Sequence, residues 1–86
     1  DERLSSTSWI RTFDPSITES EEYVWHRDNK TRYTTVLEGE GWQFQFDDNI
    51  PKKINSTEEF IIPKGVYHRL LIGNTHLVLK IEEVED

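Results

Sequence analysis

The stretch "IPKGVYHRL" (residues 62–70) decides how this sequence is read. Pro63, Lys64 and Gly65 are typical of a turn, and the β-branched, aromatic and aliphatic residues after them are typical of a strand. His68 lies inside that strand, three residues after the glycine. A histidine in such a place is a metal ligand, a catalytic base or a buried polar residue with its own hydrogen bond. The rest of the chain has to discriminate among these roles.

The composition is that of one small acidic domain. The chain has 86 residues, a formal net charge of −7 and no cysteine. A chain of this length builds a single core, and its negative charge disfavours nucleic acid and anionic membranes as partners. Without thiolates, a metal would have to be held by His, Asp or Glu. No apolar run has the length of a membrane span and no signal peptide is visible, so we expect a cytoplasmic protein.

Short β-rich segments, separated by Gly, Pro, Asn and Asp turns, fill the chain. The clearest is "GWQFQFDD" (41–48), in which Trp42, Phe44 and Phe46 fall on one face and the two glutamines on the other. About seven strands in this arrangement predict an all-β fold, a small antiparallel β-barrel or sandwich. The predicted strands are residues 8–13, 22–26, 32–39, 41–48, 60–63, 66–72 and 76–83.

Two segments resemble the motifs of the cupin family, G-x5-H-x-H-x3–4-E-x6-G and G-x5-P-x-G-x2-H-x3-N. "VLEGEGWQF" resembles the end of the first motif, with Gly39 as its closing glycine, and "IPKGVYHRL" matches the proline, glycine and histidine of the second in spacing. Ser20 and Thr57 stand where the two motifs begin with glycine. The resemblance implies a cupin-like jelly-roll. It divides this single domain into an N-terminal strand and turn, a barrel and an acidic tail, over residues 1–19, 20–83 and 84–86.

The resemblance also assigns the positions of a site. Counting back from Gly39, the glutamate position of the family holds Arg32, and its two histidine positions hold His26 and Asp28. In the family, these positions and the histidine of the second motif bind a divalent metal inside the barrel. The resemblance therefore makes His26, Asp28 and His68 the candidate metal ligands and the candidate catalytic residues.

A metal site is the first interpretation. Two histidines and one carboxylate suit non-haem iron and also zinc, so the expected cofactor is one divalent transition metal, Fe, Mn, Ni or Zn. Arg32 opposes this. At ~5 Å and an effective dielectric constant of about 20, two like unit charges cost ~3 kcal/mol, and a divalent ion doubles that cost. The metal interpretation requires Arg32 to turn away or to hold an anionic substrate.

The second interpretation has no metal. Asp28 and Arg32 then form an ion pair, and the histidines line a barrel pocket for a small polar or anionic metabolite. Some metal-free cupin relatives, the deoxysugar-nucleotide epimerases, use histidine and aspartate as a base dyad, so the resemblance also implies a sugar isomerase-type pocket. The candidate substrate-pocket residues are Arg32, Gln43, Gln45, Trp42 and Tyr67.

Three functions therefore stay open: an enzyme with or without a metal, a small-molecule binding module, and a structural homodimer without catalysis. Cupins with one barrel commonly pair through a strand edge, and exposed sheet edges need covering in any case. We therefore expect a homodimer, with a small molecule as the ligand and neither nucleic acid nor a membrane as a partner.

Overall fold

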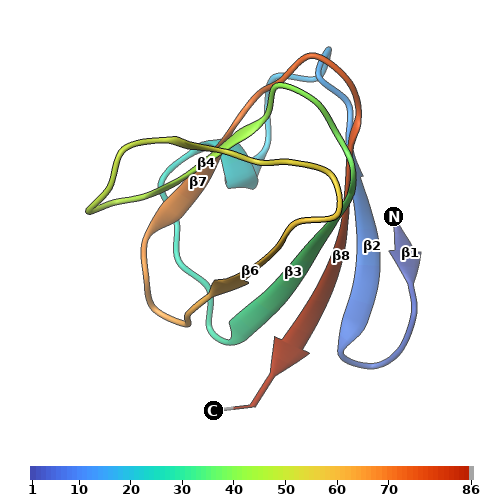
Figure 1. Cartoon of the computed structure of the whole chain (residues 1–86). Coiled ribbons are helices and arrows are strands. Elements are labelled where there is room, and N and C mark those ends of the chain that lie inside the picture. The colour runs from blue at the N-terminus through green and yellow to red at the C-terminus, as the bar shows by residue number, and fades with distance from the viewer. Residues whose placement is uncertain (86) are drawn as a thin grey trace.

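The computed structural model, which describes residues 1–85, has two antiparallel sheets connected by turns and loops (Figure 1). The larger sheet has the strand order β1-β2-β8-β3-β6 and the smaller sheet the order β5-β4-β7. The elements are β1 (Glu2–Arg3), β2 (Ser8–Phe13), the 3-10 helix η1 (Glu21–Tyr23), β3 (Thr31–Glu38), β4 (Gln43–Phe46), β5 (Lys52–Lys53), β6 (Glu59–Ile62), β7 (His68–Leu71) and β8 (Leu77–Val84).

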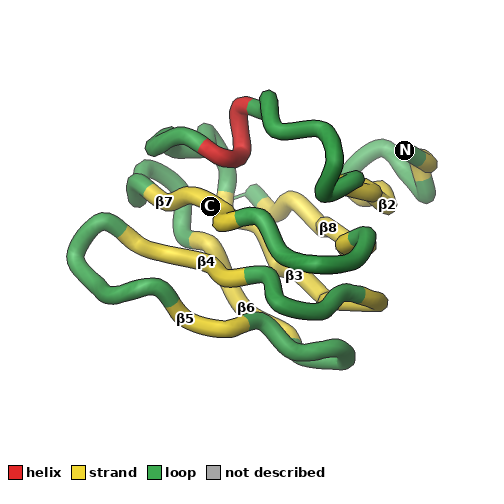
Figure 2. The backbone as a smooth tube through the Cα atoms, turned by 90° about the horizontal axis from the view of Figure 1, so that it is seen from above, coloured by secondary structure: helices red, strands yellow, loops and turns green. Residues whose placement is uncertain are grey.

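Seen from above, β4, β5 and β7 run along one side of the molecule and the strands of the larger sheet along the other (Figure 2). Every strand pair is antiparallel, and the first strand in the chain that pairs extensively, β2, lies beside the last, β8. The predicted fold class, an all-β antiparallel jelly-roll, is confirmed.

Aromatic and aliphatic side chains from both sheets fill the space between them. Trp42 is fully buried, with its ring centroid 6.0 Å from that of Phe13 and 6.1 Å from that of Tyr23. Its indole Nε1–H donates to the carbonyl of Thr75 at 2.7 Å, which satisfies the one polar atom of the side chain. Phe44 is also buried, so the alternation seen in residues 41–48 does select the inner face.

The strand predicted over residues 22–26 is wrong. The side chain of Ser20 accepts a hydrogen bond from the backbone N–H of Glu22 at 3.2 Å and caps η1. A serine side chain that accepts from the backbone two residues on offers the chain a turn in place of a sheet ladder, and here the turn prevails. The chain becomes extended again at Val24, and His26 then forms a single isolated bridge with His68.

Segments near both ends of the chain, within the predicted divisions 1–19, 20–83 and 84–86, belong to the larger sheet. The strand β2 pairs with β8 along its whole length. Val84 is the last residue of β8, and Lys30 Nζ lies 2.8 Å from a carboxylate oxygen of Glu85. Asp86, the last residue of the predicted tail, lies outside the described residues.

The turn before β7 joins the two segments that build the site. Gly65 has a φ of 77°, which favours glycine, and its N–H donates to the carbonyl of Asp28 at 3.0 Å. The N–H of Lys64 donates to the hydroxyl of Thr31 at 3.1 Å. The "IPKGVYHRL" turn is thereby tied to residues 28–31, and His68 begins β7 beside them.

Candidate functional site

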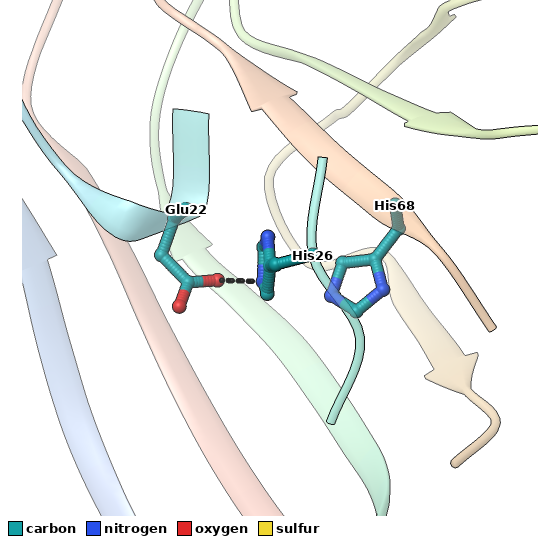
Figure 3. A group of neighbouring side chains, drawn as sticks. All are labelled: Glu22, His26 and His68. Atoms are coloured by element: carbon teal, nitrogen blue, oxygen red, sulfur yellow. Dashed lines mark ion pairs between the residues drawn. The ribbon is translucent and has the colours of Figure 1, made fainter. Parts of the chain in front are cut away.

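His26 and His68 lie side by side. Each backbone N–H donates to the carbonyl of the other residue, at 3.1 and 2.9 Å, and the ring centroids are 4.3 Å apart. His68 is 1% exposed and His26 lies nearer the surface. Figure 3 shows the two rings next to each other, with Glu22 on the far side of His26.

Both imidazole rings are held in the same tautomer. His26 Nδ1 lies 2.8 Å from the carbonyl oxygen of Val24, and His68 Nδ1 lies 2.8 Å from the carbonyl oxygen of Val66. A carbonyl only accepts, so each Nδ1 carries the hydrogen. In a neutral ring the lone pair is then on Nε2, which is how histidines that bind metals through Nε2 are commonly oriented.

A carboxylate faces each Nε2 atom. Glu22 Oε1 lies 3.2 Å from His26 Nε2, and Asp28 Oδ2 lies 3.3 Å from His68 Nε2. All four side chains are half-buried or buried, so little solvent lies between them. The site therefore consists of two carboxylate–histidine pairs joined by the backbone bridge.

An arginine lies on the outer oxygen of each carboxylate. Arg11 Nη1 donates to Glu22 Oε2 at 3.2 Å, and Arg32 Nη1 lies 3.7 Å from Asp28 Oδ1. In both pairs the arginine neutralises one oxygen and leaves the other toward a histidine. Residues 11 and 22 and residues 28 and 32 thus repeat one arrangement, Arg–carboxylate–His.

Arg32 does not point its charge at the histidines. Its Nε donates to Glu83 Oε2 at 3.3 Å, and its guanidinium carbon lies 5.4 Å from the centroid of the Trp9 ring. Glu83 is the cross-strand neighbour of Arg32 in the β3–β8 pair. The ion pair of Asp28 with Arg32 that the metal-free interpretation predicted is present, although as a single 3.7 Å contact rather than a bidentate one.

The charge state of the inner pair follows from its surroundings. Burial alone would raise the pKa of Asp28, but the contact with His68 and the charge of Arg32 outweigh it and lower the pKa below its usual value. Burial alone would lower the pKa of His68, but Asp28 and the Val66 carbonyl outweigh it and raise that pKa. Asp28 therefore favours a positive charge at Nε2 of His68.

Polar atoms at the centre of the site lack hydrogen-bond partners within residues 1–85. These atoms are buried: His26 Nε2, His68 Nε2 and Asp28 Oδ2. The distance of 3.3 Å from His68 Nε2 to Asp28 Oδ2 is within ion-pair range, but the contact does not have the geometry of a hydrogen bond. Two lone pairs that face each other in a dry place are unfavourable, so each carboxylate–imidazole pair needs a proton or a metal ion between its members.

The group of donors that fits one metal ion differs from the predicted group. One ligand atom from each of Glu22, His26 and His68 lies within 4.8 Å of the others. Both predicted histidines are therefore in the group, but its carboxylate comes from Glu22, whereas Asp28, 3.3 Å from His68 Nε2, is not part of it. The sequence did carry a signal for Glu22: a carboxylate an even number of residues before His26 shares its face in the extended chain that was predicted there.

The predicted substrate-pocket residues are dispersed. Gln43 is exposed, and Gln45 accepts two hydrogen bonds from Arg69. Trp42 is in the core, and Tyr67 is on the surface, where the guanidinium of Arg27 lies 5.3 Å from its ring centroid. Arg32 is the predicted pocket residue whose side chain contacts the site, through Asp28 at 3.7 Å.

The interior beside the site is almost filled. A cavity of about 20 Å³ lies there, with Glu22, Arg32 and Thr34 as its polar lining and apolar core side chains around the rest. That volume accommodates one water molecule. A metabolite would have to approach from the outer side, where His26 and Glu22 are partly exposed.

Comparison with known proteins supports the fold. No family model and no curated protein matches the chain. A crystal structure of a cupin-2 domain-containing protein from Shewanella frigidimarina NCIMB 400 is similar, with a TM-score of 0.66 and 24% sequence identity over 90% of this chain and 69% of that chain. The chain has the cupin fold. Among the described residues, no helix has the length and apolar character needed to cross a membrane.

Proposed function

We propose that this cupin-fold chain binds one divalent transition-metal ion through Glu22, His26 and His68. The ion would give a small polar or anionic metabolite a place to coordinate at the outer side of the site. The observation that carries the proposal is the pair of buried histidine Nε2 atoms that have no hydrogen-bond partner among residues 1–85 and that face carboxylate oxygens.

The chemistry of the donors fits such an ion. Imidazole and carboxylate ligands suit Zn, Fe, Mn and Ni. Ligand atoms that surround a metal tetrahedrally at about 2.1 Å are about 3.4 Å from one another. The distance from Glu22 Oε1 to His26 Nε2 is 3.2 Å, and all three donors lie within 4.8 Å, so a small closure would complete the set. The Nδ1–H bonds to Val24 and Val66 would orient the rings.

The remaining charged groups have supporting roles in this proposal. A bound ion would polarise an oxygen or nitrogen atom of the metabolite. Asp28, kept ionised by its lowered pKa, would add negative charge next to the metal ligands. Arg11 and Arg32 would hold Glu22 and Asp28 in place through their outer oxygens. Since Arg32 bonds to Glu83, its charge opposes the ion less than its position in the sequence suggests.

The contact of Asp28 with His68 favours a second candidate function, a metal-free isomerase or binding pocket with an Asp–His base dyad. Its support is the raised pKa of His68 and the lowered pKa of Asp28. His68 is 1% exposed, so a substrate would reach this dyad only after neighbouring side chains moved aside. For that reason the metal site is the first candidate.

Metal binding to the purified chain tests the proposal. The measurement is metal content after reconstitution with Zn, Mn, Ni or Fe(II), together with isothermal titration. We expect one ion per chain, and we expect His26→Ala and Glu22→Gln to weaken binding more than about 100-fold, because loss of a ligand exceeds the 10- to 100-fold effect of an outer-shell change.

Two matched variants control for the loss of a histidine or a charge. His76 is on the surface, where its Nε2 lies 3.6 Å from Asp14, and Glu21 is the exposed neighbour of Glu22 in η1. His76→Ala and Glu21→Gln should bind metal as the wild type does. If the wild type takes up no ion, or if His26→Ala binds as tightly as His76→Ala, the metal site is excluded and the metal-free candidate takes its place.

A further inference from the structure

An apolar pocket opens between the β4–β5 hairpin and β6, and neither His26 nor His68 is among the residues that line it. Its volume is about 330 Å³, which is at the lower end of the ~300–1,000 Å³ typical of small-molecule sites. The residues that matter for its chemistry are Phe44, Phe46, Ile50, Lys52, Ile54 and Phe60.

Three phenylalanines form an aromatic wall. The ring centroid of Phe44 lies 4.9 Å from that of Phe46, at an interplanar angle of 78°, and 5.0 Å from that of Phe60, at 50°. Rings that are tilted toward one another in this way can accept a further ring edge-to-face or offset-stacked, and each such contact adds to the effect of apolar burial. The wall therefore favours a flat aromatic ligand over a sugar or a bulky aliphatic one.

The rim of the pocket carries two lysines, Lys52 and Lys53, and one acid, Glu58. Lys52 is the direct cross-strand partner of Phe44, so its side chain leaves the sheet on the same face as that ring. Both oxygens of the nearest acid, Glu58, are engaged, one by the N–H of Asn55 at 3.0 Å and one by Lys52 Nζ at 3.5 Å. The Lys52 side chain is 77% exposed, and its ammonium has further hydrogens to donate.

The mouth of the pocket also has an exposed apolar side chain. Ile50, at the tip of the hairpin, is 82% exposed although it lines this pocket. An apolar side chain of that size at the mouth of an aromatic pocket is available to cover a ligand. On a chain with a net charge of −7, an anion would be repelled from most of the surface, so Lys52 at this rim is a local place to hold one.

We propose that this pocket binds a small planar aromatic carboxylate. The ring would lie against Phe44, Phe46 and Phe60, Ile50 would cover it, and the carboxylate would meet Lys52. This inference is independent of the metal site, because none of the residues that line the pocket is a proposed metal ligand. Phe44 belongs to both neighbourhoods, since its ring also stacks on His68 with centroids 5.4 Å apart.

The test is isothermal titration of the full chain with 2-naphthoate and with its neutral isostere 2-naphthamide. A chelator is present, so that the carboxylate cannot bind through a metal ion. We expect 2-naphthoate to bind with a dissociation constant below about 1 mM, and more tightly than 2-naphthamide. No binding of 2-naphthoate at that level, or equal affinity for the two probes, overturns the proposal.

Exposed positions supply variants that leave the core intact. Ile50→Glu should weaken 2-naphthamide about tenfold, because it removes apolar cover, and should weaken 2-naphthoate further, because the new carboxylate also repels the anion. Lys52→Gln should weaken only 2-naphthoate, by about 2- to 5-fold, as expected for an exposed ion pair. Lys80→Gln makes the same charge change on the exposed face of β8 and should alter neither. An unchanged affinity in Ile50→Glu, or equal losses in Lys52→Gln and Lys80→Gln, contradicts the site.

Discussion

Thr57 is in a backbone conformation that its side chain disfavours. It is the non-glycine residue with a positive φ, 70°, among residues 1–85, and it stands where the second cupin motif begins with glycine. Its N–H donates to the carbonyl of Val36 at 2.7 Å, which holds the turn in place. A β-branched residue in this region costs about 1–3 kcal/mol, which the surrounding hydrogen bonds have to offset.

Replacing Thr57 by glycine should therefore stabilise the protein. Part of the relieved strain is lost again because glycine has more freedom in the unfolded chain, so we expect the free energy of unfolding to rise by about 0.5–1 kcal/mol in Thr57→Gly. Urea denaturation measures it. Thr57→Ala retains the Cβ atom and should bring little gain. Equal stability of the two variants would show that the backbone at Thr57 is not strained.

The Asp28–His68 pair predicts a pH dependence of stability in the metal-free protein. The folded-state pKa of Asp28 is lowered, so its contribution is lost as the pH falls through that value. The folded-state pKa of His68 is raised, so its contribution is lost as the pH rises through that value. Measured with a chelator present, the stability of the wild type relative to Asp28→Asn should be greatest between the two pKa values and decrease on both sides.

Asp14→Asn provides the comparison. The pKa of Asp14 is lowered chiefly by hydrogen bonds from the backbone and side chain of Ser16. Its contribution should thus disappear on the acidic side, without a matching alkaline decrease. An Asp28→Asn difference that stays constant above neutral pH would contradict the role of His68.

At the level of secondary-structure elements, two connections between strands each require a glycine, for different reasons. A Cβ atom on Gly73, in the loop between β7 and β8, would contact the ring of Trp42 and would lie 2.5 Å from its backbone nitrogen and 2.7 Å from the carbonyl oxygen of Glu40. A Cβ atom on Gly65, in the turn before β7, would meet nothing within 4 Å, although φ there is 77°. The first glycine is required by packing and the second by backbone conformation alone.

The two alanine variants should therefore differ. Gly73→Ala pushes backbone against backbone and should lower the free energy of unfolding by about 3 kcal/mol, at the upper end of overpacking effects. Gly65→Ala should cost only about 1–2 kcal/mol, the penalty of a left-handed conformation. Denaturant midpoints with unchanged slopes measure both. A smaller loss in Gly73→Ala than in Gly65→Ala would mean that the loop moves to accommodate the methyl group.

For the whole molecule, the exposed edge of the larger sheet is the feature that bears on assembly. The strand β6 pairs with β3 on one side and is the outermost strand of the larger sheet. Tyr33 and Ile61, which are cross-strand partners in this pair, are both exposed. Unpaired edges with apolar neighbours invite a second chain, so the expected homodimer stays a prediction and β6 is the edge we assign to it.

Sedimentation velocity over a range of concentrations tests the dimer. We expect the wild type to dimerise and Ile61→Lys to remain monomeric, because a lysine on an edge strand disfavours edge pairing. Ile72→Lys changes an exposed apolar residue outside β6 and should leave the dimer intact. A wild-type chain that stays monomeric at every concentration excludes the homodimer.

The sequence by itself determined the all-β fold and most of the strands. It also showed that the two histidines belong to one group. Alternation in 41–48 and the Pro–Gly turn before His68 are local signals, since side chains alternate with a period of two and turn residues act on their own backbone. The spacing from Gly39 and from Pro63 was enough to select His26 and His68 as one group. The strand predicted at 22–26 was wrong because the cap made by Ser20 competes with the sheet at the same local level.

Only the tertiary structure decided where the Arg32 side chain points, which carboxylates face the histidines, and how little space is left in the interior beside them. Arg32 bonds to Glu83 because β3 and β8 pair in one particular register, and Asp28 reaches His68 because the turn before β7 is tied to residues 28–31. The predicted pocket residues are dispersed because aliphatic and aromatic side chains fill the space between the sheets. These outcomes depend on contacts between residues far apart in the chain, which local pattern and spacing do not encode.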